Sequence, residues 1–116
     1  ENERSIEAFA QINRYHVSQI PYFLQKLQET MEGDTHLLDK TMIVYGSPMG
    51  NPNVHNHKRC PLFIVGGANG TLPGNLHVRA EPGTSMANVM LTLMHNLGLD
   101  DLKSFGDSTN EFIFSA

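Results

Sequence analysis

The sequence has no tryptophan, a single cysteine and a low content of charged residues, 17% in all. One cysteine, Cys60, excludes an internal disulfide bond and a cysteine-rich zinc site. The net charge is −4, and Lys58 and Arg59 form the only adjacent pair of basic residues. Because binding to a nucleic-acid backbone needs clustered Lys and Arg, we do not expect nucleic acid as a partner.

Long apolar runs are also missing. No run approaches the roughly 20 residues that cross a bilayer, so we expect no membrane span. The first residues lack the basic-then-apolar order of a signal peptide. The chain begins with Glu1 and has 116 residues, 40% of them apolar, which is enough for at most one domain. We expect it to be a processed or excerpted part of a longer protein.

The N-terminal third has the periodicity of a helix. Apolar residues recur every three or four positions from Ile6 to Met31, which predicts a helical segment over residues 1–33. Gly33–Asp34 is expected to end it. Pro21 lies inside the pattern and is expected to produce a kink or to separate two abutting helices.

Residues 41–80 are expected to contain strands. "TMIVYG" (41–46) and "PLFIVGG" (61–67) are short and apolar on both faces, as central strands are when helices cover both sides of a sheet. "LHVRA" (76–80) alternates and predicts a weaker strand. A helix is expected over 84–98, capped by Thr84 or Ser85, and the tail 105–116 is compatible with a last short strand.

This order predicts an α/β fold in which a few-stranded mixed sheet is flanked by helices. So few strands leave bare edges that invite pairing with another chain. We therefore interpret residues 1–116 as a single segment, the C-terminal portion of a larger α/β domain. Its expected partner is the remainder of its own protein or a partner chain that completes the sheet. The alternative is a small α/β domain that dimerises through its edge.

The loop 47–60 between the two strong strands is the candidate functional site. Its prolines and Gly50 exclude the helix that a parallel crossover needs, so the strands, if neighbours, are expected to be antiparallel. The loop then lies beyond the C-terminal end of strand 41–46, the edge of open α/β sheets at which ligands bind. Its polar residues are Ser47, Asn51, Asn53, His55, Asn56, His57, Lys58 and Arg59.

His55 and His57 are the candidate metal ligands. An extended backbone would place both rings on one face, close enough to share an ion, with Asn51 or Asn53 as a further donor. The alternative is that the imidazoles bond to loop carbonyls and organise a long connection. Lys58 and Arg59 either contact an anionic group or form a solvated turn.

The stretch "TMIVYGSPMGNPNVHNHKRCPLFIVGG" resembles the C-terminal region of the HXXSHH family, secreted bacterial proteins of unknown function. The likeness continues through "GTSMANVMLTLMHNLGL" and "FGDST", and backwards into "INRYHVSQIPYFLQKL". That family is similar to the alkaline phosphatase and sulfatase superfamily. The resemblance implies the C-terminal part of an alkaline-phosphatase-like sandwich, with a metal site at the strand ends, in a periplasmic or extracellular protein.

For function, the resemblance implies metal-dependent hydrolysis of an anionic ester. A divalent metal (zinc, manganese or calcium) would be held by His55, His57 and Asn51, and the substrate by Ser47, Asn53, Lys58 and Arg59. The motif also departs from the superfamily. Pro48 and Met49 stand in place of a metal-binding aspartate and histidine, and Asn51 stands where members of the family commonly have an aspartate. The alternative is a non-catalytic, degenerate relative that acts as an exported binding or assembly protein.

Overall fold

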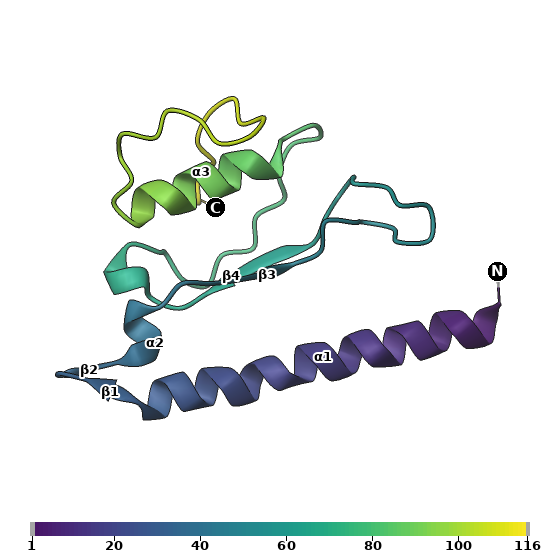
Figure 1. The fold of residues 1–116 in the computed structure, drawn as a ribbon, viewed down its shortest axis with the longest axis horizontal. Coiled ribbons are helices and arrows are strands. Elements are labelled where there is room, and N and C mark those ends of the chain that lie inside the picture. Colours follow the sequence, from purple (N-terminus) through teal and green to yellow (C-terminus); the bar gives the residue numbers. More distant parts are fainter. Residues whose placement is uncertain (1, 116) are drawn as a thin grey trace. The chain divides into compact units, whose positions relative to one another are not determined.

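A computed structural model describes residues 2–115; Glu1 and Ala116, the ends of the expected helical segment and tail, lie outside them. The chain divides after Lys40 into two compact units. The first contains α1 (Glu3–Glu29), β1 (Met31–Glu32), β2 (Thr35–His36) and α2 (Leu37–Lys40) (Figure 1). The second contains β3 (Ile43–Gly46), β4 (Leu62–Val65), a 3-10 turn (Ala68–Gly70) and α3 (Met86–Asn96). The expected mixture of α and β structure is confirmed.

Helix α1 dominates the first unit. Asn2 caps it, because its side-chain oxygen accepts a hydrogen bond from the backbone N–H of Arg4 at 3.0 Å. The helix runs through Pro21 as one element of 27 residues, so the expected pair of abutting helices is not found (Figure 1). It ends at Glu29, because Thr30 is already extended. Gly33, at φ +63°, lies in the turn between β1 and β2 and does not end the helix.

No residue of α1 is buried. The half-buried side chains, Ile20, Leu24 and Leu27, lie in its C-terminal half, the part of the first unit where α2 contacts α1. Ile6 and Phe9 remain 53% and 49% exposed. None of the helices in the described part of the chain combines the length and the apolar character needed to cross a membrane.

Strands β3 and β4 pair in the second unit and are antiparallel, as expected, with Tyr45 opposite Phe63 and Val44 opposite Ile64. The rings of Tyr45 and Phe63 lie 5.2 Å apart between centroids, a favourable cross-strand pair. The described residues contain two sheets, β1–β2 and β3–β4, each with two antiparallel strands. The expected mixed sheet is therefore not present among them, and the alkaline-phosphatase-like sandwich stays a prediction.

Residues 76–80 form no strand, although their sequence alternates. A strand needs a neighbour to accept and donate its backbone hydrogen bonds, and none of the described residues supplies one. The described part of the tail, 105–115, also forms no strand. Backbone N–H groups of the tail donate instead to side chains of α3.

Helix α3 carries most of what is buried. Ser85 caps it, as the sequence predicts: its hydroxyl accepts from the N–H of Ala87 at 3.1 Å and donates to Asp107 at 2.8 Å. Gly98, at φ +87°, follows the end of the helix and closes the expected range 84–98. The buried apolar residues of the described chain are Leu91, Leu93 and Ala68.

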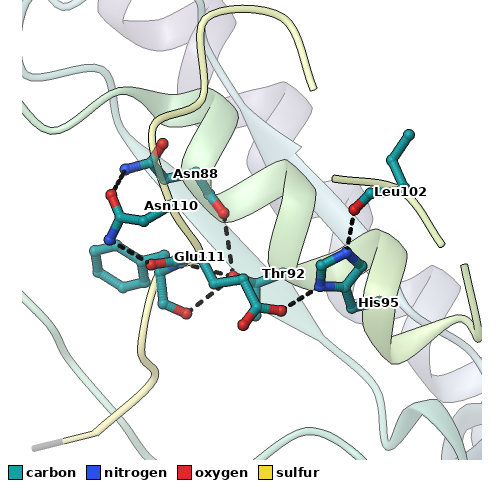
Figure 2. Close-up of polar contacts among 7 residues, drawn as sticks. Asn88, Thr92, His95, Leu102, Asn110 and Glu111 are labelled. Carbon is teal, nitrogen blue, oxygen red and sulfur yellow. Dashed lines mark hydrogen bonds and ion pairs between the residues drawn. The ribbon is translucent and has the colours of Figure 1, made fainter. Parts of the chain in front are cut away.

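Asn88 fixes the tail to α3. The amide is buried, with 5% of the residue exposed. Its oxygen accepts from the N–H of Thr109 at 2.9 Å. Its nitrogen donates to the side-chain oxygen of Asn110 at 3.1 Å, as Figure 2 shows. One turn later the hydroxyl of Thr92 accepts from the N–H of Phe112 at 2.7 Å and contacts its carbonyl at 3.0 Å. The side chains of Asn88 and Thr92 thus bond to backbone groups of the tail that a neighbouring strand would otherwise pair with.

Replacing Asn88 by alanine removes these bonds and leaves the N–H of Thr109 without its partner. We expect Asn88→Ala to lower the free energy of unfolding by about 2 kcal/mol, measured by urea denaturation. Asn96→Ala is the matched control, because it makes the same change in the same helix at a side chain without a hydrogen bond to the described residues. Equal losses in the two variants would contradict this role for Asn88.

Candidate functional site

Loop 47–60 continues the β3–β4 pair as a narrow hairpin. The N–H of Ser47 donates to the carbonyl of Pro61 at 3.1 Å, one step beyond the sheet. The two sides then approach so closely that a Cβ on Gly50 would lie 1.8 Å from the carbonyl oxygen of Lys58. Only glycine fits there without moving the backbone.

The tip of the loop is closed by its asparagines. Backbone bonds join Gly50 N–H to the carbonyl of Asn56 at 3.0 Å and Asn56 N–H to the carbonyl of Asn51 at 3.2 Å. The side-chain oxygen of Asn51 accepts from the N–H of Asn53 at 3.0 Å, and that of Asn56 from the N–H of Lys58 at 2.9 Å. Both amide oxygens therefore support local turns.

The carbonyl of Pro48 ties the outgoing side of the loop to the returning side. It lies 2.7 Å from Nδ1 of His57 and accepts from Sγ of Cys60 at 3.1 Å. A carbonyl can only accept, so Nδ1 of His57 carries the proton and donates it. For His57 this is the structural role that the sequence offered as the alternative to metal binding.

His55 does not have the extended backbone on which the metal hypothesis was based. Its φ is +51°, in the left-handed region, and Arg59 has φ +56°. Such values reverse the direction of the chain, so the argument that residues two apart present their rings on one face does not apply here. The extended backbone assumed for the His55–His57 pair is therefore not present at His55, and metal binding by the two imidazoles stays a prediction.

The remaining proposed metal ligand, Asn51, is also occupied by the loop through its amide oxygen. No carboxylate occurs in residues 47–60, and the described residues contain no group of three or more His, Cys, Asp or Glu side chains that could hold a metal ion. Structural and catalytic zinc sites take at least three protein ligands, and calcium takes six or more oxygens. The residues present do not form a complete site for either.

The proposed substrate contacts divide into two kinds. The hydroxyl of Ser47 is engaged with the backbone N–H and carbonyl of Met49 at 3.1 and 3.0 Å, and the N–H of Asn53 with Asn51. The side chains of Lys58 and Arg59 are exposed and make no ion pair with any described residue. Of the proposed set, these two cations are the groups still able to meet an anion.

A second polar cluster lies on α3. Nδ1 of His95 contacts the carboxylate of Glu111, and Nε2 lies 2.7 Å from the carbonyl of Leu102 (Figure 2). The carboxylate of Glu111, and then the carbonyl of Leu102, raise the pKa of His95 above its ordinary value of 6.5. Both ring nitrogens therefore have partners, as in a structural histidine. The sequence does not reveal Glu111, because the partner comes from an irregular tail 16 residues away.

Comparison of the chain with protein-family models, curated proteins and solved structures found no match. The resemblance to the HXXSHH family therefore stays a prediction from the motifs quoted above.

Removal of the His57 imidazole tests its structural role. We expect His57→Ala to lower the free energy of unfolding by about 1 kcal/mol, the usual contribution of one hydrogen bond, and to shift the backbone amide resonances of Pro48's neighbours. His55→Asn is the control, since asparagine tolerates the left-handed backbone at that position. A stable His57→Ala variant with an unchanged loop spectrum would contradict the role.

The His95 contacts predict a dependence on pH. Both ring nitrogens face acceptors, so the imidazolium makes both bonds and the neutral ring loses one. Because the folded pKa is raised, the stabilisation is complete below the unfolded pKa of about 6.5. It is lost as the pH rises through the folded pKa. We expect NMR titration to give His95 a pKa above its ordinary value of 6.5, and His95→Gln to remove this pH dependence.

Proposed function

We propose that this chain is a non-catalytic binding module of an exported α/β protein of alkaline-phosphatase type. Its partner is further α/β polypeptide that covers the β3–β4 ribbon and extends its sheet. The observation that carries the proposal is the exposure of apolar side chains on both faces of that ribbon. Val44 is 41% exposed and Tyr45 37% exposed, and consecutive strand residues point to opposite faces.

A two-stranded ribbon with exposed apolar side chains buries too little surface to be stable by itself in water. On the partner strand, Phe63 is 39% exposed. Each Å² of apolar surface removed from water contributes about 25 cal/mol, and an isolated pair of strands is marginally stable at best. Strands that are apolar on both faces are typical of sheets covered on both sides. A partner that covers the ribbon would therefore stabilise it by burying this apolar surface.

The loop supports binding over hydrolysis. Pro48 and Met49 offer no ligand suited to zinc, manganese or calcium, and the side chains of Ser47, Asn51 and His57 bond to the loop's own backbone. Metal-dependent hydrolysis of an anionic ester stays a prediction of the resemblance. It requires donors from outside the described residues.

Light scattering across a concentration series tests the binding role. We expect the 116-residue chain to self-associate and to bind the apolar dye ANS, because the ribbon lacks its partner. Phe63→Lys should reduce both effects, whereas His36→Lys, an exposed change outside the ribbon, should not. A monomer that binds no dye would contradict the proposal.

Hydrolysis is tested separately with p-nitrophenyl phosphate and p-nitrophenyl sulfate in the presence of zinc, manganese or calcium. We expect no turnover above the blank. Turnover that His57→Ala abolishes would overturn the non-catalytic role and support the metal-dependent alternative.

A further inference from the structure

A groove of about 330 Å³ lies beside α3, between residues 78–81 on one side and 110–113 on the other. Thr84 and Asn88, at the start of the helix, contribute to its lining. Figure 2 shows Asn88, Asn110 and Glu111 along the side of α3 that the tail follows. The volume is at the lower end of the range for small-molecule sites, about 300–1,000 Å³.

One wall of the groove has unused backbone hydrogen-bonding groups. Within the described residues, no N–H or carbonyl of residues 76–80 makes a hydrogen bond. None of these residues has a positive φ, and their sequence, "LHVRA", alternates between apolar and polar side chains. A segment with these properties and no neighbour is a template for pairing with another strand.

The side chains in the groove leave few polar groups for a small ligand. The amide of Asn88 is occupied by Thr109 and Asn110, and the carboxylate of Glu111 by His95. Asn110 in turn donates to the carbonyl of Glu111 at 3.0 Å. Besides the side chains of Arg79 and Glu81, the free polar groups are therefore those of the backbone.

The charges in the groove also disfavour an anion. Arg79 is the one cation among the lining residues, and it is accompanied by the carboxylates of Glu81 and Glu111. The apolar lining consists mainly of Val78, Phe112 and Ile113, of which Ile113 is 77% exposed. This combination of unpaired backbone and apolar side chains matches the requirements of an extended peptide.

We propose that residues 76–80 form a docking edge for an extended strand of a partner polypeptide, which lies in the groove between 78–81 and 110–113. The strand exchanges backbone hydrogen bonds with 76–80 and places alternate apolar side chains on Val78, Phe112 and Ile113. This deepens the proposed binding role, on which it rests, by locating a second surface away from the β3–β4 ribbon. The strand expected at 76–80 from its sequence forms when the partner supplies its neighbour.

The test uses a ¹⁵N-labelled 116-residue chain and an acetylated, amidated hexapeptide of alternating threonine and valine as the probe. We expect saturable shifts of the backbone amides of residues 77–81 and 111–114, together with slower amide exchange at 77–80. A control peptide with N-methyl groups at alternate residues keeps its side chains but loses donors. Two lost hydrogen bonds should weaken its binding about tenfold or more.

Two proline variants of the protein test the backbone hydrogen bonds between residues 76–80 and the peptide. Because alternate N–H groups of a strand point to opposite sides, Val78→Pro and Arg79→Pro remove donors of opposite parity. Only one of them should lose peptide binding, and Arg79→Ala should separate loss of the charge from loss of the donor. Equal effects of the two proline variants would overturn the proposal.

The peptide result on the unmodified chain does not depend on how these variants fold. Equal binding of the N-methylated peptide, or no shift at 77–81, overturns the docking edge. Shifts confined to β3 and β4 overturn it while leaving the proposed role of the ribbon intact. Shifts at 77–81 that depend on protein concentration without peptide would assign the groove to a second copy of the chain and overturn the choice of partner.

Discussion

The carbonyl of Pro48 is the acceptor on which loop 47–60 depends. It meets His57 and Cys60 from the returning side of the loop at 2.7 and 3.1 Å. The two sides are then close enough for Gly50 and Asn56 to bond through their backbones. A donor set that resembles a metal site in the sequence is therefore used to close a hairpin. The same residue types would serve either role, and the contacts to the backbone favour closure of the loop.

The rest of the chain exposes apolar side chains and unpaired backbone, which the proposed partner would cover. In the described residues the buried apolar side chains are Ala68, Leu91 and Leu93. Even a 60-residue domain removes about 60% of its unfolded surface from water, so three buried apolar residues make a small core for this chain. The ribbon β3–β4 shows apolar side chains on both faces, and 76–80 shows unpaired backbone. The ribbon therefore lacks burial of its apolar side chains, and residues 76–80 lack partners for their backbone hydrogen-bonding groups. A binding module accounts for both.

Features set by neighbours in sequence were predictable. Ser85 as the cap of α3, Gly98 after its end and the antiparallel pairing of β3 with β4 follow from local chemistry and loop composition. Features set by distant partners were not. The tail has no strand because Asn88 and Thr92 take up its backbone groups, and 76–80 has none because no described residue pairs with it. The left-handed backbone of His55 could not be read from "NVHNHKR", since histidine adopts either conformation. It removed the premise of a two-histidine site.

The tautomer of His57 tests the account most directly. Long-range ¹⁵N–¹H correlation spectra of the chain labelled with ¹⁵N in its histidines, recorded with and without one equivalent of zinc, report which ring nitrogen carries the proton. We expect a protonated Nδ1 on His57 and no joint shift of His55 and His57 on addition of zinc. An unprotonated Nδ1 would contradict the hydrogen bond to Pro48, and shifts of both imidazoles that saturate at one zinc per chain would restore the metal site.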